Sequence, residues 1–296
     1  MRSLLAILPF VLACHHAAKP ATPKTPPDGQ VHRFDIGALH ALALKDGRIV
    51  EANDGKTFGL GHTPAEVSAL FGHDVGSIEL SIQPLLVRDG DRTFLFDTGA
   101  LRPDWAPEAG ALMASLHLGG VEPAAVTDIF VSHHHGDHVG GLLTKSGALA
   151  FPNATIHLST PEWEAMKATK DAGDLVPAIT PKVVPFAPGA MLFPSVTAVP
   201  VEGHTPGHSA YRITSGSESL LYIGDTAHSS VVSVRRPDWP VDYDTNKDLA
   251  RASRRTLLER SAAEHTHLYG VHFPFPGTGY ITKTDDGFTY VPDPAK

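Results

Sequence analysis

Runs of apolar residues recur along the chain, and polar or glycine-containing turns bound each run. Such runs, rich in Val, Ile, Leu and Phe, predict β-strands at 78–87, 93–99, 128–132, 154–158, 195–201 and 219–225. The first two are separated by Arg88-Asp89-Gly90-Asp91, which predicts a hairpin. The segments IFV, within 128–132, and LLYI, within 219–225, are apolar on both faces. They therefore predict central strands that are covered on both sides.

Helix signals lie between these runs. Thr160-Pro161 predicts a helix with Thr160 as its N-cap, and the segment Thr245–Asp248 resembles a capping box that opens an amphipathic helix to about residue 265. The tetrapeptide GHTP occurs at 61–64 and at 203–206, but only the first copy precedes a helical pattern. We therefore expect Thr63 to be an N-cap and His62 to have no part in the chemistry. Strands that alternate with helices predict a layered α/β fold.

The N-terminal 30 residues differ in character from the rest. Arg2 precedes the apolar run LLAILPFVLA (4–13), which predicts a signal peptide over 1–13 because it is too short to span a membrane. Cys14 follows, and this junction resembles a bacterial lipobox, which implies a lipidated Cys14 and a protein anchored in the cell envelope. A plain signal peptide of a secreted or periplasmic protein is the alternative. Residues 14–30 are proline-rich and predict a tether, so the folded domain is expected over 31–296.

The net charge and the cysteine content exclude several classes of function. The formal net charge is −8, so the chain lacks the basic footprint of a nucleic-acid-binding protein. Cys14 is the single cysteine, which excludes an intramolecular disulfide and a zinc site built from several cysteines, and disfavours a catalytic thiol. A lipid anchor would be the only contact with a membrane. The expected partner is a small-molecule substrate, and a homodimer is compatible with the sequence.

The segment VSHHHGDHVGG (131–141) carries the densest candidate chemistry. His133, His135, Asp137 and His138 follow directly after a predicted buried strand, and Gly136 is expected to let the backbone turn between the two pairs. Imidazole and carboxylate ligands suit a divalent ion such as Zn²⁺. Three further candidates follow later apolar runs: His204, Asp225 and His272. His134 is expected to point away from its neighbours, and His208 to orient the loop that carries His204.

This ordered set resembles the metallo-β-lactamase superfamily, together with Asp97-Thr98-Gly99, EGHTPGHS (202–209) and YIGDT (222–226). The resemblance implies a four-layer αβ/βα sandwich with two divalent ions, most simply zinc, between its sheets. It implies that His133, His135 and His204 hold one ion, that Asp137, His138 and His272 hold the other, and that Asp225 bridges them. Such a pair, about 3.5–4 Å apart, lowers the pKa of a shared water, and the resulting hydroxide attacks a C=O or P=O centre.

Two segments indicate the subgroup. GDTAH (224–228) and VHFPFPGTGY (271–280) resemble the methyl parathion hydrolase and lactonase-like group, which implies lactones, aryl esters or phosphotriesters as substrates. Asp225 and His228 are the expected catalytic residues. His228 stands where acyl-homoserine-lactone hydrolases carry a Tyr, and we expect it to hydrogen-bond the substrate or the leaving group. Phe273, Phe275 and Trp163 are the expected substrate-binding residues, whereas Phe71 is expected in the core.

Alternatives of other classes stay open at this point. A persulfide dioxygenase of the same fold would hold a single iron, and the presence of second-metal ligands argues weakly against it. A β-lactamase usually carries Cys or Ser in place of Asp225, and a thioesterase shares the SHHHGDH-type motif. A non-catalytic lipoprotein would not need a complete ligand set.

Overall fold

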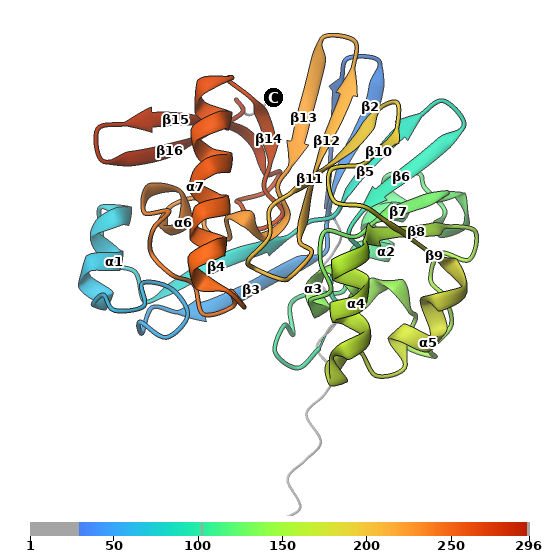
Figure 1. The fold of residues 1–296 in the computed structure, drawn as a ribbon, viewed down its shortest axis with the longest axis horizontal. Helices are drawn as coiled ribbons and strands as arrows, with labels where there is room; N and C mark the ends of the chain where they lie inside the picture. The colour runs from blue at the N-terminus through green and yellow to red at the C-terminus, as the bar shows by residue number, and fades with distance from the viewer. Residues whose placement is uncertain (1–29, 102, 295–296) are drawn as a thin grey trace, which may run out of the picture.

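The computed structural model describes residues 30–101 and 103–294, which form two facing sheets with helices on both outer sides (Figure 1). The first sheet has the strand order β1-β2-β5-β6-β7-β8-β9. Its strands are β1 (Gln30–Ile36), β2 (Leu39–Lys45), β5 (Leu85–Asp89), β6 (Arg92–Phe96), β7 (Asp128–Phe130), β8 (Thr155–Ser159) and β9 (Val183–Phe186). Pairing is antiparallel from β1 to β6 and parallel from β6 to β9.

The second sheet has the strand order β10 to β16, as along the chain. Its strands are β10 (Met191–Phe193), β11 (Val196–Pro200), β12 (Ser209–Ser215), β13 (Glu218–Tyr222), β14 (His267–Tyr269), β15 (Thr278–Thr284) and β16 (Gly287–Pro292). Only the β13–β14 pair is parallel, because α7 (Lys247–Ala263) lies between these two strands in the sequence. A short ribbon of β3 (Gly47–Ala52) and β4 (Ser77–Ile82) lies beside the two main sheets (Figure 1).

Three apolar cores separate the four layers. One lies between the sheets and contains Phe94 and Phe130 from the first sheet and Tyr211 and Tyr222 from the second. Another packs the outer face of the first sheet under α2 (Leu112–Leu118), α4 (Thr160–Ala168) and α5 (Leu175–Ile179). The third packs the second sheet against α6 (Val232–Arg235) and α7. This arrangement confirms the four-layer αβ/βα sandwich.

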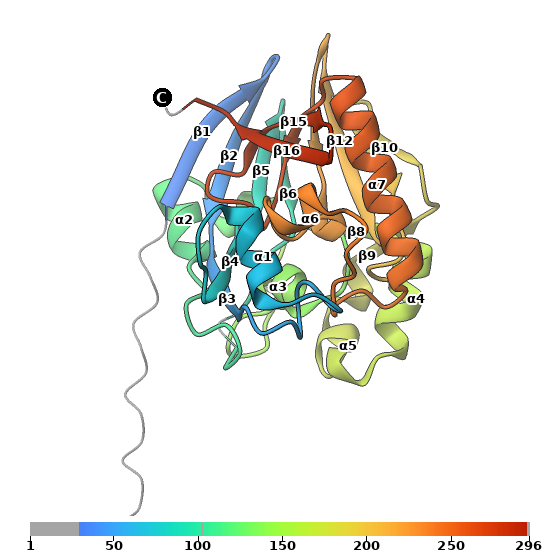
Figure 2. The ribbon, with the colours of Figure 1, turned by 90° about the vertical axis from the view of Figure 1, so that its left-hand side faces the viewer.

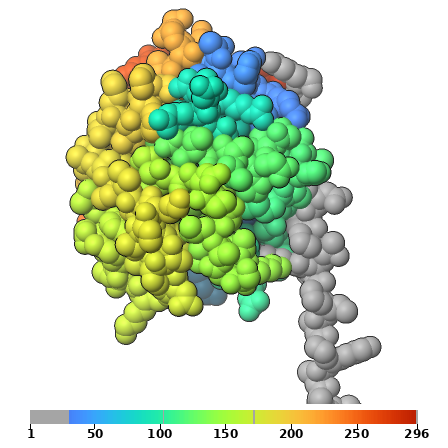
Figure 3. Space-filling view, turned by 90° about the vertical axis from the view of Figure 1, so that its right-hand side faces the viewer, coloured from blue at the N-terminus to red at the C-terminus, as the bar shows by residue number. Residues whose placement is uncertain are grey.

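The helix α1 (Pro64–Phe71) contacts α6 beside the β3–β4 ribbon (Figure 2), and a fourth apolar cluster joins these elements. The green to yellow part of the chain, including α4 and α5, forms the face shown in Figure 3. None of the helices in the described part of the chain is long and apolar enough to cross a membrane.

The predicted strand at 78–87 is two strands in different sheets. β4 ends at Ile82 and pairs with β3, whereas β5 begins at Leu85 and pairs with β2 and β6. Gln83 between them is fully buried, and its amide nitrogen donates to the carbonyls of Gly270 and Phe273. Pro84 has no backbone N–H to donate, so the chain changes sheet at this point. The predicted hairpin is formed by β5 and β6.

Two helix starts differ from the prediction by one residue. Ser159, not Thr160, caps α4, because its hydroxyl accepts from the backbone N–H of Glu162. Asn246, not Thr245, caps α7 by accepting from the backbone N–H of Leu249. Thr63 caps α1 as predicted, in a capping box with Glu66. The predicted signal peptide and Cys14 lie outside the described residues, and Gln30, assigned to the tether, already belongs to β1.

Candidate metal centre

The predicted ligands converge at one end of the sandwich. The loop after β7 and the short helix α3 (Gly136–Val139) carry four of them, and the other three follow β11, β13 and β14. Asp225 lies in the 3-10 turn Gly224–Thr226. Six of the seven side chains are buried, and His135 is half-buried. The ligands therefore lie in loops and short turns that follow strands, and the strands hold their side chains close to one another.

One group consists of His133, His135, His204 and Asp225, whose ligand atoms all lie within 4.8 Å of one another. Nε2 of His204 lies 3.1 Å from Nε2 of His133 and 2.9 Å from Nδ1 of His135. Oδ2 of Asp225 lies 3.3 Å from Nε2 of His204 and 3.6 Å from Nε2 of His133. Three imidazole nitrogens and one carboxylate oxygen therefore face a common point.

A second group consists of Asp137, His138, His272 and again Asp225. Oδ1 of Asp225 lies 3.1 Å from Nε2 of His138 and 3.0 Å from Nε2 of His272. Oδ2 of Asp137 lies 3.5 Å and 3.4 Å from the same two nitrogens. The two oxygens of Asp225 thus face different groups, so this carboxylate is the residue shared by both.

In three of the ligand rings, hydrogen bonds at Nδ1 leave Nε2 facing the centre of the cluster. Nδ1 of His204 faces Oδ1 of Asp244 at 3.0 Å, Nδ1 of His138 faces Oδ2 of Asp97 at 2.7 Å, and Nδ1 of His272 faces the Ser81 carbonyl at 2.6 Å. A neutral ring that donates from Nδ1 presents a lone pair at Nε2.

Lone pairs that converge in a buried space repel one another unless a cation lies between them. Nε2 of His138 and Oδ1 of Asp225 are buried and make no hydrogen bond. Two divalent ions fit this donor set, because imidazole nitrogens and carboxylate oxygens are the ligands that Zn²⁺ and similar ions take.

Charge in the cluster follows from burial and from the neighbouring groups. Burial alone would lower the pKa of His204, but hydrogen bonds to Asp225 and Asp244 outweigh burial and raise the pKa to about 9. Burial, together with the charge of His204, lowers the pKa of His135 to about 3. Burial opposes ionisation of Asp225, yet the surrounding histidines hold its pKa well below the usual range. The carboxylates that favour a proton on His204 would equally stabilise a metal ion in its place.

Asp97 and Asp244 are buried carboxylates that fix the ligand rings. Asp97 accepts hydrogen bonds from the backbone and hydroxyl of Ser132 and from Tyr222, each at 2.7 Å, as well as facing His138. The sequence singled out Asp97 as part of a family motif, but gave no signal for Asp244.

Asp244 is held in turn by Arg254, a fully buried arginine of α7. The guanidinium donates to Oδ2 of Asp244 at 2.8 Å and to the carbonyls of Thr226, Pro237 and Trp239. A buried Arg–Asp pair of this kind fixes geometry through several charge-assisted hydrogen bonds. Helix α7 is thereby tied to the position of His204.

Glu162 joins the two loops that carry the first group. This fully buried carboxylate accepts from the backbone N–H and the ring of His134, and from the Thr205 hydroxyl at 2.7 Å and the Gly207 N–H at 2.9 Å. His134 therefore points away from the ligand set, as expected. From sequence, Glu162 was only an acidic residue in the first turn of a helix, and a lone Glu gives no stronger signal.

His208 holds the loop that carries His204, the role expected from the sequence, and it also contacts the turn that carries Asp225. Its Nδ1 faces the Val201 carbonyl at 3.1 Å, and its Nε2 accepts from the backbone N–H of Asp225 at 3.0 Å. The ring is fully buried, and burial together with the charge of His204 lowers its pKa to about 4, so it stays neutral and can accept. His208 thus connects the His204 loop with the turn that carries Asp225.

A cavity of about 350 Å³ opens onto the cluster. Its non-ligand lining consists of Ile49, Glu51, Leu80, Trp105, Gly136, His228 and Tyr243. His228 is almost fully buried, and neither ring nitrogen makes a hydrogen bond, although Nε2 lies 3.2 Å from Oδ2 of Asp225. A buried polar ring that makes no hydrogen bond, at the wall of a cavity, is suited to bind a ligand there.

The lack of a side chain at Gly136 allows close packing against Trp105 and is not needed for a tight turn, in contrast to the prediction. Gly136 has no positive φ, and a Cβ at this position would lie 3.1 Å from the ring of Trp105. Trp105, which is 54% exposed, lies between the cavity at the cluster and a neighbouring cavity that includes Leu101 and Met166.

The three aromatic residues expected to bind substrate do not line the cavity at the cluster. Phe273 is fully buried in the core under α7, and its ring packs against Tyr290. Trp163 is buried in the core of the first sheet, and Phe275 packs at the edge of the core between the sheets. Phe273 follows the ligand His272 in the sequence, but their side chains diverge. Phe71 packs in the cluster around α1, as expected.

Three further histidines lie away from the ligands, among them His62, which was expected to have no part in the chemistry. His62 stacks on Trp239 with 3.8 Å between the ring centroids. His265 and His267 both stack on Tyr280, and His267 belongs to β14 and pairs with Asp293.

Fold and site together define a class: an αβ/βα sandwich with two adjoining groups of histidine and aspartate residues that can each hold a metal ion. The family model of the metallo-beta-lactamase superfamily matches residues 79–264, which include six of the seven ligands. The chain belongs to this superfamily of metal-dependent hydrolases.

Curated relatives match only parts of the chain. A hydroxyacylglutathione hydrolase of Cupriavidus metallidurans is 30% identical over 147 residues, which cover 49% of this chain and 48% of the relative. Enzymes with the same name from Pseudomonas syringae pv. syringae (32% over 101 residues, 34% of this chain and 33% of the relative) and Rhodopseudomonas palustris (53% over 45 residues, 15% and 16%) match shorter stretches. The chain thus aligns with less than half the length of these relatives.

Solved structures match over most of the chain. AidC, a dizinc quorum-quenching lactonase in complex with the product N-hexanoyl-L-homoserine, superposes with a TM-score of 0.84 at 29% identity, covering 90% of this chain and 99% of AidC. The hydrolase AbOPH has a TM-score of 0.80 at 26% identity, covering 92% and 100%. An N-acyl homoserine lactone lactonase at 20% identity has a TM-score of 0.62, covering 83% of this chain and 100% of its own, and shares the fold.

Proposed function

We propose that the protein is a binuclear metal hydrolase of small, uncharged carboxylic esters, with lactones as the preferred substrates. The observation that carries this proposal is the position of Asp225, whose two oxygens face two separate buried ligand groups at the wall of a cavity. Two divalent ions held there, for which we propose zinc, would supply Lewis acidity and a water molecule of lowered pKa.

The chain's own side chains would position the substrate. Ile49, Leu80 and Trp105 give the cavity apolar walls that can bind the hydrocarbon part of an ester. His228 is close enough to Asp225 to reach a substrate at the centre. Neither of its ring nitrogens makes a hydrogen bond, and the one that carries the proton can donate to the carbonyl or to the leaving oxygen. A catalytic role of His228 and Asp225 is therefore part of this proposal.

The charges of the residues that line the cavity favour a neutral substrate. The curated relatives are named hydroxyacylglutathione hydrolases, and the glutathione moiety carries carboxylates that need cationic partners. Among the described residues that line the cavity none is Lys or Arg, whereas Glu51 adds a further carboxylate. Likeness to a lactonase extends over 90% of the chain, but likeness to the curated relatives over at most 49%. We therefore rank lactones above glutathione thioesters.

Aryl esters and phosphotriesters are uncharged as well. The segments GDTAH and VHFPFPGTGY, which resemble the methyl parathion hydrolase group, support these substrates as a second candidate class. The complete second ligand group argues for two ions and against a mononuclear iron oxidoreductase. Asp225, shared by both groups, argues against a β-lactamase.

Metal analysis of the purified full chain, combined with a substrate screen, tests the proposal. We expect two divalent ions per chain, loss of activity with a chelator, and kcat/KM for γ-lactones at least 10-fold above that for hydroxyacylglutathione. β-Lactams, aryl esters and phosphotriesters complete the screen. One iron per chain with oxygen consumption, or no turnover of any ester, would contradict the proposal.

Export of the protein and lipidation of Cys14 are separate proposals, based on the N-terminal sequence. Expression with the native N-terminus followed by mass spectrometry tests them. A mature chain that begins at Cys14 and carries acyl chains supports both. Cleavage at another position supports export alone, and an uncleaved chain contradicts both.

A further inference from the structure

The guanidinium of Arg254 in α7 lies between two turns that carry metal ligands, and its side chain is fully buried. Nε donates to the carbonyl of Thr226 at 2.8 Å, and Thr226 directly follows the shared ligand Asp225. Nη2 donates to Oδ2 of Asp244 at 2.8 Å, and Oδ1 of the same carboxylate faces Nδ1 of His204 at 3.0 Å. One side chain therefore contacts the turn of Asp225 and, through Asp244, the ring of His204.

The remaining hydrogen bonds of the guanidinium fix its own position. Nη1 donates to the carbonyls of Pro237 and Trp239 at 3.1 Å and 3.2 Å. An arginine presents its donors in a rigid, planar fork, so contacts in several directions allow only one orientation of this group. A lysine would carry the same charge on a flexible stem with three donors, and it could not keep all these partners at once.

Contacts of α7 with the loop before His204 reinforce this connection. The backbone N–H of Asn246, the N-cap of α7, donates to the carbonyl of Gly203 at 2.8 Å. The hydroxyl of Ser253 donates to the carbonyl of Glu202 at 2.7 Å. The loop is thus held at its backbone by the same helix that orients the His204 ring.

The two ligand groups depend on different buried carboxylates. Asp97 orients His138 of the second group and accepts its other hydrogen bonds from neutral groups. Asp244 orients His204 of the first group and is paired with a buried cation, Arg254. None of the hydrogen bonds that Arg254 makes in the described part of the chain reaches a ligand that belongs only to the second group.

Resting on the proposed function, we infer that Arg254 is a positioning residue for one ion of the centre. It sets the distance between His204 and Asp225, and thereby the affinity of the first group (His133, His135, His204 and Asp225) for its ion. Partners behind a metal ligand commonly change metal affinity about 10- to 100-fold, because they fix the orientation of the ligand. The second group keeps three ligands that do not depend on Arg254, so its affinity should follow Asp97 instead.

Competition of the full-length protein with a chromophoric chelator for Zn²⁺ tests this inference. Arg254→Lys keeps the charge but loses the fork, so it should lower the affinity for one ion about 10- to 100-fold and that for the other ion by no more than about 3-fold. Arg255→Lys is the matched control, because Arg255 is the next residue of the same helix and its partly exposed guanidinium pairs with Asp238. This control should leave both affinities unchanged.

Combination with Asp97→Asn identifies the ion. Since Asp97 supports His138, the two substitutions should weaken different ions, and the double variant should show both losses at the size of the single variants. Asp244→Asn is a second route if Arg254→Lys does not fold. It leaves the guanidinium its three carbonyl partners but removes the charge that Arg254 pairs with, and it should weaken one ion only, again additively with Asp97→Asn.

Equal weakening of both ions would overturn the inference, and so would two unchanged affinities. Lower stability in urea with both affinities intact would show a merely structural role for Arg254. Two tightly bound ions without turnover of any ester would contradict the proposed function but not the inference. An unmodified protein that binds no ion would contradict both, because Arg254 would then support no metal ligand.

Discussion

Oδ2 of Asp97 lies 2.7 Å from Nδ1 of His138, and both side chains are fully buried. Asp97 is not a member of either ligand group. It stands at the end of β6 and has a positive φ of 59°, which lets its carboxylate reach across to the loop after β7. The conspicuous early Asp of the sequence thus orients a ligand, and His138 presents Nε2 to the centre as a result.

Replacing Asp97 by Asn should weaken metal binding more than it changes the fold of the sheets. The amide has only one acceptor oxygen for the four groups that Asp97 accepts from, and it offers an N–H₂ toward His138. We expect a 10- to 100-fold loss of affinity for the more weakly held metal, measured by competition with a chromophoric chelator. The exposed Asp35→Asn is the control, because Asp35 pairs only with His40 on the surface. Equal affinities of the two variants would contradict an orienting role.

Glu162→Gln should weaken the connection between the two loops that Glu162 joins and thereby lower the stability of the protein. Gln can accept at only one oxygen, so at least one of the contacts to His134, Thr205 or Gly207 is lost. We expect the free energy of unfolding at pH 7 to fall by about 1–3 kcal/mol. Urea denaturation measures this loss. Glu164→Gln on the same helix is the control, because Glu164 is exposed and pairs only with Lys167.

The same variant has a defined pH dependence. Burial opposes ionisation of Glu162, but its hydrogen bonds with His134 and Thr205 lower the pKa below the ordinary 4.5. Its stabilisation is therefore fully present above pH 4.5 and is lost as the pH falls through the lower pKa of the folded state. The stabilities of the unmodified protein and of Glu162→Gln should converge in that acidic range. A constant difference down to low pH would show that ionisation of Glu162 does not contribute.

Gly203→Ala should disturb the His204 loop. Gly203 has a φ of +121°, and a Cβ there would lie 2.2 Å from the backbone nitrogen of Ala250 in α7. The helix and the loop would have to separate, so we expect at least about 2 kcal/mol of destabilisation together with loss of bound metal. Gly216→Ala has a similar backbone cost at φ +61° but no atom within 4 Å, so it should lose about 1 kcal/mol and no metal. Thermal unfolding and metal analysis compare the two.

His228→Ala should reduce turnover without removing metal. His228 is not in either ligand group, yet it lines the cavity beside Asp225. A hydrogen bond to the reacting ester contributes about 10²-fold or more to the rate, so kcat should fall by this order on any accepted ester. His62→Ala, which removes a surface ring stacked on Trp239, should leave kcat unchanged. An unchanged kcat in His228→Ala would remove the residue from the mechanism.

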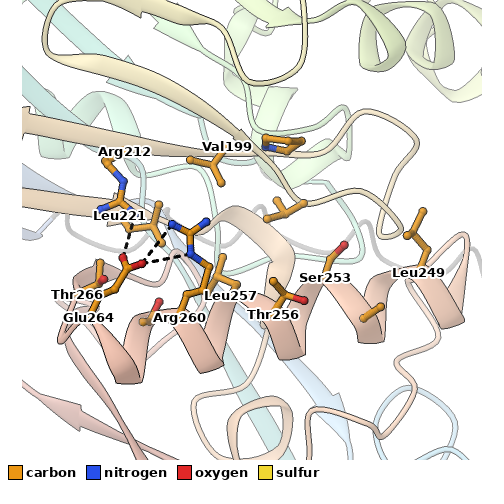
Figure 4. Close-up of a pocket in the computed structure, with 14 residues that line it drawn as sticks. Val199, Arg212, Leu221, Leu249, Ser253, Thr256, Leu257, Arg260, Glu264 and Thr266 are labelled. Carbon is orange, nitrogen blue, oxygen red and sulfur yellow. Dashed lines mark hydrogen bonds and ion pairs between the residues drawn. The ribbon is translucent and has the colours of Figure 1, made fainter.

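Another cavity of the protein lies apart from the metal ligands. A cavity of about 320 Å³ lies between α7 and the outer face of the second sheet (Figure 4). At one end Arg260 and Arg212 share the carboxylate of Glu264, and Leu221 and Leu257 form part of the apolar lining. No metal ligand lines this cavity, so variants in it serve as controls for effects at the centre.

The sequence by itself determined the fold family and the candidate ligand set that the structure brings together. His133, His135, Asp137 and His138 lie within six positions, and strand ends precede His204, Asp225 and His272, so their local spacing carries the signal. The approximate positions of the strands and helices could also be predicted, because apolar runs and helix caps are local sequence patterns. Helix boundaries that depend on one hydrogen bond, such as the caps at Ser159 and Asn246, differed from the predicted positions by one residue.

Only the tertiary structure decided which side chains surround the ligands. Glu162, Asp244, Arg254 and Tyr243 reach the site from elements far away in the sequence, and no local pattern distinguishes them from surface residues of the same type. Phe273 was expected in the pocket because it follows a ligand, yet its ring turns into the core under α7. A residue next to a ligand in the sequence has its backbone near the site. The direction of its side chain depends on packing between elements that meet only when the chain is folded.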